Sequence, residues 1–583
     1  MLVYALPWVL AIKLLTYRVF GLRHMAWRHI GFEDLLRIVS ANAAASLFVA
    51  GTLRALIGPA FPRSIYILDG LLCVVLDAGT RAVIRILFDL SRSPLRPGVR
   101  RVLIYGAGQA GVTLLNEFRR QPEPTAHVAG FLDDDPSKRD MRLHGVRVFG
   151  GRQDLLPTVS KLFVDEVLIA LPTASGNDIT EILARCHQAR VSAKRVPALS
   201  EILENKILAD QIREVRIEDL LGRPPVRLED GPVRTQIEGQ IVLVTGAGGS
   251  IGSELCRQIA RHAPAAIVGL DQAETALYEI EQELQAAFPG LLFCPEIGSV
   301  QNRTRLDEVL EHHRPRAIYH AAAYKHVPMM EAHLFEAVEN NVFGTRNVAR
   351  AAACWGVREL VVISSDKAVR PANIMGATKR AAELVSVLES SQDLKTVAVR
   401  FGNVLGSNGS VIPRFRQQIA RGGPVTVTHP EMRRFFMTIP EAAQLVLQAG
   451  AMGLGGEIFV LEMGEPVRIL DLARKMILLS GLRPEVDIPI RFSGLRPGEK
   501  MYEELSAYEE NTTATGHRQI RVLTGAAPDR EALAREFEQL RDAVHTRDSA
   551  GAVMALKELV PEYNPSTGLL RSLLQEKAHS VVA

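Results

Sequence analysis

Residues 359–383 read ELVVISSDKAVRPANIMGATKRAAE, and this stretch decides the fold of the second half of the chain. It begins with the apolar, β-branched run Leu360–Ile363, which predicts a buried strand of a parallel sheet. A polar loop containing Pro371 follows, and at about Ile374 the chain resumes as a helix. Open α/β sheets bind ligands at the carboxyl ends of their strands, so we expect this loop beside a crevice.

The loop and the helix carry the side chains of a proton-transfer site. Ser365, Asp366 and Lys367 leave the strand end, while Met375 and Lys379 are four residues apart and share one helix face. An acid and two amines would therefore converge on one crevice, as general acid–base chemistry requires. The alternative is a solvated Asp366–Lys367 pair with Lys379 on the surface, which is the commoner situation for isolated charges.

A dinucleotide-binding pattern lies upstream of this stretch. Residues Gly239–Ala260 read GQIVLVTGAGGSIGSELCRQIA, a strand and a glycine-rich loop that opens directly into a helix. Gly246, Gly249 and Gly252 let the backbone approach a pyrophosphate, whose charge the helix amides attract. The next strand ends at Asp271, nineteen residues beyond Gly252. An acid there is placed to bind the adenosine ribose, which favours NAD over NADP.

Another strand and its turn are predicted at Arg316–Ala323 (RAIYHAAA), where they would pass beneath the nicotinamide half of a bound dinucleotide. The loop that follows contains Lys325 and His326. We interpret His326 as a residue that orders this loop, with a role as a base as the alternative. Asn341, on the next helix, is expected to brace the backbone of the site.

A second Rossmann-like start lies nearer the N-terminus. Residues Arg100–Gly111 (RRVLIYGAGQAG) form a strand followed by GxGxxG, and another apolar strand ends at Asp133. No catalytic constellation follows before residue 225, so we favour a structural or regulatory unit and leave nucleotide binding open. The Pro- and charge-rich segment Arg223–Pro232 is predicted to be a linker.

The first 94 residues contain three apolar stretches near membrane-spanning length: Leu2–Phe20, Leu35–Ile57 and Ser64–Phe88. Charged residues weaken all three, so a bundle of buried helices is the alternative. Basic residues at 18, 23, 28 and from 92 to 101 fall on one side of three spans, which the positive-inside rule makes cytoplasmic. The N-terminus would then lie outside, which suggests that this chain lacks a first span that relatives possess.

The length of 583 residues predicts two to four domains. The patterns above divide the chain into transmembrane helices (1–94), a first Rossmann-like domain (95–225), a catalytic domain (226–509) and a C-terminal helical tail (510–583). A formal net charge of +3 provides no strong field for nucleic acid. The five cysteines are scattered without metal-ligand spacing, so neither a disulfide framework nor a metal site is expected.

Residues 240–509 resemble the extended short-chain dehydrogenase/reductase superfamily, and within it the membrane-anchored nucleotide-sugar 4,6-dehydratases of polysaccharide and protein-glycan synthesis. The resemblance rests on the motifs TGAGGSIG, HAAAYKHVP, SSDKAVRPANIMGATK, RFGNVLGSNGSVIPRF, RRFFMTIPEA and GLRPGEKMYEEL. Membrane spans and a first Rossmann-like unit also resemble the long-form members. The expected fold class is therefore α/β, with two doubly wound parallel sheets in tandem after a transmembrane region.

One departure from the superfamily matters for mechanism. The usual YxxxK motif has Met375 in place of the tyrosine, while Lys379 is intact. A methionine cannot ionise, so it cannot remove the C4 hydroxyl proton. The retaining long-form dehydratases resemble this chain in having Met, whereas the C5-inverting short forms keep Tyr. The resemblance therefore favours retention at C5.

The resemblance implies a cycle in which NAD oxidises C4, water is eliminated across C5–C6, and the hydride returns to C6. Lys367 would be the C5 base, with its pKa lowered by burial or by Lys379, and Asp366 the acid for the C6 hydroxyl. Lys379 would hold the cofactor ribose and favour the C4 alkoxide, and Ser365 would bond the C4 oxygen. The acceptor of the C4 proton stays open, with Asp366 the first hypothesis.

The remaining site residues are also assigned from the resemblance. Expected cofactor-binding residues are Gly246, Gly249, Ser250, Ile251, Gly252, Asp271, Ala321, Ala322 and Lys379. Expected substrate-binding residues are Lys325, Asn403, Ser410, Val411, Pro413, Arg434, Arg496 and Glu499, with the two arginines as diphosphate clamps.

The sequence thus predicts a cytosol-facing, NAD-dependent UDP-N-acetylglucosamine 4,6-dehydratase of the bacterial inner membrane. We expect it to self-associate, and the tail either packs on the catalytic domain or extends an oligomer contact. The rivals are a C4-epimerase, a C5-inverting dehydratase, and a catalytically lapsed NAD-binding scaffold. Asp366–Lys367 and the missing tyrosine count against an epimerase, and a scaffold would bind NAD without turnover.

Overall fold

The computed structural model describes residues 2–20, 32–57, 63–91, 99–121, 126–172, 174–196, 213–217, 219, 230–507, 511–524 and 528–582. The predicted orienting arginines Arg23 and Arg28 and most of the predicted linker lie outside these residues. The chain divides into an N-terminal unit that ends at Arg100 and a larger unit that comprises nearly all the rest. Each unit is described by itself.

Three long helices form the N-terminal unit: α1 (Leu2–Val19), α2 (Phe32–Ile57) and α3 (Arg63–Ser91). Their positions confirm the three predicted helical stretches. Among the described residues, Ile38–Ala55 is the stretch long and apolar enough to cross a membrane, judged by length and composition. The Nζ of Lys13 contacts the Asp69 carboxylate at 2.6 Å, so two of the charges in α1 and α3 neutralise each other.

A five-stranded sheet with the order β2-β1-β5-β6-β7 forms the first Rossmann-like domain, as predicted. β1, β5 and β6 run parallel and β7 is antiparallel to β6. The elements are β1 (Arg100–Tyr105), α4 (Gln109–Arg120), β2 (Ala126–Leu132), a β3–β4 hairpin (Arg142–Leu143, Val146–Arg147), α5 (Leu155–Leu162), β5 (Glu166–Ile169), α6 (Gly176–Gln188), β6 (Ser192–Arg195) and β7 (Arg213–Glu214).

The catalytic domain is built on a nine-stranded sheet with the order β10-β9-β8-β11-β12-β13-β18-β22-β21. The first seven strands are parallel, β22 runs antiparallel to β18, and β21 runs antiparallel to β22. The order reverses between β8 and β11, so their carboxyl ends open a crevice. The strands are β8 (Ile241–Thr245), β9 (Ala266–Asp271), β10 (Phe293–Ile297), β11 (Ala317–His320), β12 (Glu359–Ile363), β13 (Lys395–Arg400), β18 (Ile458–Leu461), β21 (Asn511–Ala514) and β22 (Ile520–Thr524).

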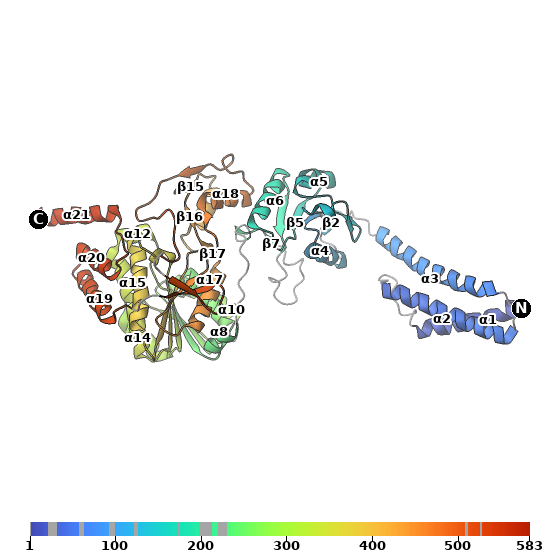
Figure 1. Cartoon of the computed structure of the whole chain (residues 1–583), viewed down its shortest axis with the longest axis horizontal. Helices are drawn as coiled ribbons and strands as arrows, with labels where there is room; N and C mark the ends of the chain where they lie inside the picture. The colour runs from blue at the N-terminus through green and yellow to red at the C-terminus, as the bar shows by residue number, and fades with distance from the viewer. Residues whose placement is uncertain are drawn as a thin grey trace. The chain divides into compact units, whose positions relative to one another are not determined.

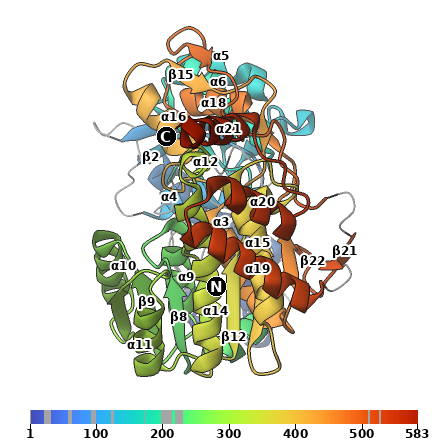
Figure 2. The same ribbon diagram turned by 90° about the vertical axis from the view of Figure 1, so that its left-hand side faces the viewer.

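Helices cover both faces of this sheet, because its central strands are apolar on both sides. One face carries α8 (Asp230–Ile237), α9 (Ser250–Ala260), α10 (Glu274–Ala287) and α17 (Ile439–Met452). The other carries α11 (Arg303–His313), α12 (Val327–Ala332), α13 (Leu334–Val338), α14 (Gly344–Cys354) and α15 (Ile374–Glu389). Outside this layer α19 (Arg530–His545) and α20 (Ser549–Leu559) lie against α15, and α21 (Thr567–Val582) follows (Figures 1 and 2).

Short pairs of strands and two helices form the subdomain above the carboxyl ends of the sheet. The elements are β14 (Asn403–Val404) with β17 (Phe436–Met437), β15 (Val425–Val427) with β20 (Ile490–Phe492), β16 (Arg433–Arg434) with β19 (Val467–Arg468), α16 (Val411–Ala420) and α18 (Ile469–Leu479). This subdomain supplies the second wall of the site.

Two predicted boundaries need correction. The linker was predicted to reach Pro232, but α8 already begins at Asp230, because proline is compatible with the first turn of a helix. The tail was predicted to begin at residue 510 and to be helical over Asp529–Leu559; α19 and α20 confirm the helical part, but Asn511–Ala514 and Ile520–Thr524 are strands. β22 pairs with β18, so the catalytic sheet extends beyond residue 509.

Candidate active site

The glycine-rich loop after β8 packs too closely against its surroundings for other side chains. Gly246 has a φ of +69°, and a Cβ there would lie 2.7 Å from the Ala322 nitrogen. A Cβ on Gly252 would lie 2.0 Å from the Gly246 oxygen, so α9 begins directly against the strand end. The Asp271 carboxylate accepts the Gly248 N–H at 2.9 Å. The glycine-rich loop and the helix N-terminus therefore fit the pyrophosphate of a dinucleotide, and the acid at the strand end fits its ribose.

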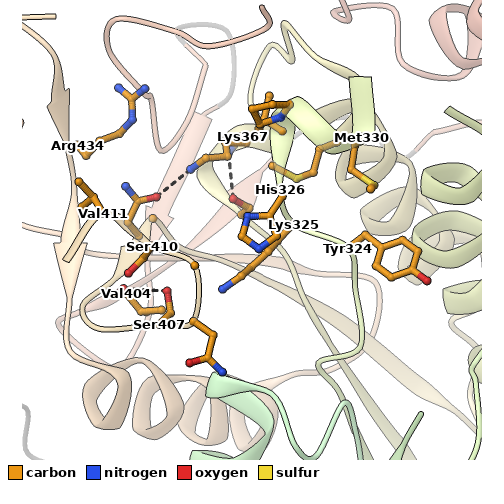
Figure 3. A pocket seen from close by; sticks show the side chains of 18 of the residues that line it. Tyr324, Lys325, His326, Met330, Lys367, Val404, Ser407, Ser410, Val411 and Arg434 are labelled. Carbon is orange, nitrogen blue, oxygen red and sulfur yellow. Dashed lines mark hydrogen bonds between the residues drawn. The ribbon is translucent and has the colours of Figure 1, made fainter. Parts of the chain in front are cut away.

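A cavity of about 870 Å³ opens between this loop, the β11 and β12 ends and the small subdomain (Figure 3). Most predicted site residues line it: Gly249, Ser250, Ile251, Gly252, Ala321, Lys325, Ser365, Lys367, Met375, Lys379, Asn403, Ser410, Val411, Arg434, Arg496 and Glu499. The predicted residues outside this lining are Gly246, Asp271, Ala322, Asp366 and Pro413. Cofactor-type and substrate-type residues thus share one space.

Asp366 and Lys367 form a tight pair at the end of β12. The Lys367 Nζ donates to Asp366 Oδ1 at 2.9 Å and to Asn403 Oδ1 at 3.0 Å. Ser365 Oγ donates to the same Asp366 oxygen at 3.0 Å. Asp366 is fully buried, so the alternative of a solvated loop pair is wrong. Gly402 packs closely on this carboxylate, because a Cβ there would lie 3.1 Å from Asp366 Oδ2.

The expected pKa of Lys367 needs correction. Burial alone would lower the pKa of Lys367, but the charges of Asp366 and Glu503 outweigh it and raise the pKa above its usual range. Lys367 is therefore an ammonium in the resting site, and Lys379 is not the neighbour that sets its charge. Any role as a base requires that it first lose a proton.

Glu503 is the site residue that the sequence reasoning missed. It lines the cavity with a nearly buried side chain, and its Oε1 lies 3.7 Å from Arg434 Nη2. Burial raises the pKa of Glu503, against the opposing effect of Lys367. The signal was present in GLRPGEKMYEEL, where Glu503 and Glu504 are adjacent. Only the fold separates them, because Glu504 pairs with Arg370 at 2.9 Å.

Lys379 lies on α15 beside the cavity and is 7% exposed, so the alternative of a surface lysine is wrong. Its Nζ donates to the Ile363 carbonyl oxygen at 2.5 Å, which ties α15 to the end of β12. Burial lowers the pKa of Lys379 to about 8, although Glu383 opposes this shift. Met375, one turn earlier, is 2% exposed and also lines the cavity.

The two arginines that were predicted to clamp the diphosphate, Arg434 and Arg496, differ in burial and in hydrogen-bond partners. Arg434 is buried, and its Nη atoms donate to the backbone oxygens of Arg433, Lys500 and Met501. It therefore holds the segment that carries Glu503, which the clamp hypothesis did not foresee. Arg496 is exposed at the cavity rim, and its backbone N–H donates to Glu499 at 3.3 Å.

The predicted bracing role of Asn341 is confirmed by the geometry, whereas the loop-ordering role of His326 stays a prediction. Asn341 accepts the Tyr324 N–H at 2.8 Å and donates to the Tyr324 oxygen at 3.0 Å, so it braces the loop after β11. It lies in a π-helical turn, Glu339–Phe343, before α14. The His326 ring packs against Gly409, where an added Cβ would lie 2.5 Å from Cε1. Figure 3 shows Lys325 and His326 at the cavity wall.

The chain is similar to known proteins over most of its length. Residues 242–524 match the family described as "Polysaccharide biosynthesis protein", and residues 24–197 match a "CoA-binding domain". The chain is 44% identical over 498 residues to the probable polysaccharide biosynthesis protein EpsC of Bacillus subtilis, covering 84% of this chain and 83% of that one. It is 44% identical over 493 residues to the capsular polysaccharide biosynthesis protein CapD of Staphylococcus aureus, covering 84% and 82%.

More distant similarities cover about half of the chain. A UDP-glucose 4-epimerase of Rickettsia rickettsii is 36% identical over 282 residues, which cover 47% of this chain and 79% of the epimerase. The solved structure of Pen from Bacillus thuringiensis is 32% identical, covers 51% of this chain and 92% of its own, and has a TM-score of 0.46. The near full-length match to EpsC and CapD shows that this chain belongs to the polysaccharide biosynthesis protein family that includes both.

Proposed function

We propose that the protein is a NAD-dependent UDP-N-acetylglucosamine 4,6-dehydratase that supplies a UDP-4-keto-6-deoxy sugar for polysaccharide, lipopolysaccharide or protein-glycan synthesis. The observation that carries the proposal is the Asp366–Lys367 pair. A carboxylate and an amine lie 2.9 Å apart beside a cavity that the glycine-rich loop also lines. Eliminating water across C5–C6 requires one group that takes a carbon-bound proton and one that gives a proton to oxygen.

The residues that would hold NAD are the glycines of the 246–252 loop, Asp271 and Lys379. The fit rests on the close approach at Gly246 and Gly252 and on the strand-end carboxylate. When bound, the nicotinamide would supply reversible hydride transfer, first from C4 and later to C6. Asp271 favours NAD, because its carboxylate would repel the 2′-phosphate of NADP.

The protons of the proposed cycle balance if Asp366, Lys367 and Glu503 carry them in turn. Asp366 takes the C4 hydroxyl proton and later gives it to the departing C6 hydroxyl, which leaves as water. We assign the proton that Lys367 must first lose to Glu503, because the charges of the two groups act on each other. Lys367 then takes the C5 proton as a neutral amine and returns a proton to C5. Glu503 then gives its proton back to Lys367. The raised pKa of Glu503 makes this transfer less costly than transfer to an ordinary carboxylate.

The other residues of the site orient the sugar. The charge of Lys379 favours the C4 alkoxide, and Ser365 bonds the C4 oxygen. Met375 packs where other superfamily members have an ionisable tyrosine, which leaves the C4 proton to Asp366 and supports retention at C5. Asn403, the 410–413 segment, Arg496 and Glu499 would contact the UDP half.

A C4-epimerase is the second candidate, and the similarity to the Rickettsia epimerase favours it. An epimerase needs only the redox step at C4. Such an enzyme has no use for a second amine that is paired with one buried carboxylate and acted on by another. The Asp366–Lys367–Glu503 arrangement therefore supports the dehydratase.

We further propose that the N-terminal helices anchor the protein in the bacterial cytoplasmic membrane, with the catalytic domain in the cytoplasm. Ile38–Ala55 supports this proposal by its length and composition. We expect several copies to associate in the membrane. Measuring the size of the detergent-solubilised protein tests this expectation.

The deciding experiment is proton NMR of the full-length protein in detergent with UDP-N-acetylglucosamine in D₂O. A new 6-methyl signal, deuterium at C5 and retained C5 configuration are expected. Inversion at C5 would overturn the interpretation of Met375 but keep the dehydratase. A galacto-configured product without a methyl group would establish the epimerase, and an unchanged substrate with bound NAD would contradict both.

A further inference from the structure

The helix that carries Met375 and Lys379 is held at both ends by the C-terminal tail. At the N-terminus of α15 the Glu331 carboxylate accepts the Ile374 N–H at 2.7 Å. The same carboxylate accepts Ser566 Oγ of the tail at 2.7 Å. A carboxylate is well placed here, because the first N–H groups of a helix lack intrahelical partners and its N-terminus is positive.

The tail also reaches the loop between the acid–base pair and α15. The Asn564 N–H donates to the Pro371 carbonyl oxygen at 2.8 Å. Tyr563, fully buried, belongs to the same apolar cluster as Met375 and Ala377. Both ends of the 366–374 loop are therefore fixed, one by β12 and one by the tail.

The C-terminus of α15 is fixed by a second tail residue. Arg530 Nη2 donates to the carbonyl oxygens of Val387 at 3.2 Å and Leu388 at 2.6 Å. These oxygens lie in the last turn, where helix carbonyls lack intrahelical partners and a cation complements the dipole.

A third contact lies midway along α15. Arg380 Nε donates to Glu562 of the tail at 2.8 Å, and its Nη1 donates to Glu383 at 2.9 Å. Glu383 in turn accepts Ser364 Oγ at 2.5 Å, next to the acid–base pair. A chain of polar contacts thus connects the tail to the end of β12.

We propose that residues 530–566 act as a clamp that sets the axial position of α15, and so the reach of Lys379 into the cavity and the placement of the 366–374 loop that carries Asp366 and Lys367. Ser566, Glu562 and Arg530 are positioning residues, and the catalytic part of this inference rests on the proposed function. The glycine-rich loop is held separately, by Gly246 N–H on the Leu270 oxygen at 2.8 Å. Loosening the clamp should therefore lower turnover more than it weakens NAD binding, in which Lys379 is only one of several residues, because small displacements of positioned groups cost rate steeply.

The test compares Ser566→Ala with Ser572→Ala in the full-length protein. Ser572 is an exposed tail serine whose hydroxyl donates within α21, to the Leu569 oxygen at 2.8 Å. The first measurement is amide hydrogen exchange of peptides spanning 366–380. Ser566→Ala should speed exchange at the α15 N-terminus by about 2- to 10-fold, the range for one lost hydrogen bond, and Ser572→Ala should not.

The second measurement is steady-state turnover of the same variants. Ser566→Ala should lower kcat by about 2- to 10-fold with KM and retained NAD near their original values, and Ser566→Thr should restore kcat. Ser566 Oγ also accepts the Leu569 N–H, so Glu331→Ala tests the bond from its other side. The double variant should lose less than the sum of the single losses.

The two measurements separate the clamp from the proposed function. Exchange needs no substrate, so faster exchange in Ser566→Ala supports the clamp even if the wild-type protein dehydrates nothing. Dehydration by the wild type with identical exchange and kcat in Ser566→Ala and Ser572→Ala would overturn the clamp and leave the function standing. If Glu331→Ala fails to fold, the Ser566 and Ser572 pair still decides.

Discussion

The two Rossmann-like domains of this chain share their glycine geometry and differ in what surrounds the strand-end acid. A Cβ on Gly111 would lie 2.1 Å from the Gly106 oxygen, and a Cβ on Gly252 would lie 2.0 Å from the Gly246 oxygen. In the first domain Asp133 accepts the Ala107 N–H at 2.8 Å and also pairs with Lys138 at 2.9 Å.

In the catalytic domain the acid meets only backbone groups among its described hydrogen bonds. Asp271 accepts the N–H groups of Gly248 and Ala273, both at 2.9 Å, and keeps its charge available to a ribose. The comparison teaches that both glycine patterns, GxGxxG in the first domain and GxxGxxG in the second, report close packing of a helix on a strand. The ligand depends on side chains outside the motif.

The largest effect should come from removing one lysine in each domain. Lys367→Ala should lower turnover by about 10²- to 10⁴-fold and stop exchange of the C5 proton with solvent, because the amine that moves it is gone. Lys138→Ala should leave turnover unchanged. Product formation and C5 deuteration by NMR, with NAD retention as a folding control, measure both. Persistent C5 exchange in Lys367→Ala would remove this residue from the base role.

Substituting the equivalent glycines, Gly111 and Gly252, compares the two domains by their stability. Gly252→Ala and Gly111→Ala should each destabilise their domain by about 1–3 kcal/mol, since the new methyl group overlaps a backbone oxygen. Only Gly252→Ala should also lose bound NAD. Thermal unfolding and cofactor content of the purified variants give the two readouts. Loss of NAD in Gly111→Ala would place a dinucleotide in the first domain and break the distinction.

The two lysines also differ in the carboxylates around them. Lys138 pairs with Asp133 and Asp135, whereas Lys367 pairs with the buried Asp366 and is also acted on by the buried Glu503. Glu503→Gln should lower kcat by about 10- to 100-fold with little change in NAD content, since it removes the group that takes the lysine proton. Glu504→Gln is the matched control, because Glu504 pairs with Arg370 at the surface. Equal activities of the two variants would exclude Glu503 from the proton transfer.

The smallest expected effect is a pH dependence. Burial lowers the pKa of Lys379 to about 8, so its ammonium is present below this pH and lost above it. If that charge favours the C4 alkoxide, kcat should fall as pH rises through about 8, and Lys379→Arg should flatten the fall because arginine stays charged. A kcat that instead rises through pH 8 would make Lys379 a proton acceptor.

Much of the site could be predicted from local pattern. The strand, loop and helix around Asp366 follow from an apolar run, Pro371 and spacing, which act within a few residues. The direction of the Lys367 pKa shift was not predicted, because it depends on how the charges of Asp366 and Glu503 outweigh burial, and only the fold buries the pair and brings Glu503 near. The tail reaches the N-terminus of α15 through a bond between Ser566 and Glu331 of α12, 235 residues apart, and no periodicity reports such a bond.

The predicted domain boundary at residue 509 was wrong for a related reason. Asn511–Ala514 is short and polar, so it lacks the apolar alternation by which strands are predicted. Its partner β22 is specified by pairing with β18, which the sequence alone does not show.

The hairpin of β21 and β22 has a consequence for solubility. Without it the sheet would end at β18, whose residues Ile458–Leu461 are all buried and apolar, and whose open backbone groups would invite other chains to pair. With it the sheet ends in the threonine-rich, largely exposed strand β21. A chain cut after residue 509 should therefore aggregate, whereas one that keeps residue 524 should stay dispersed.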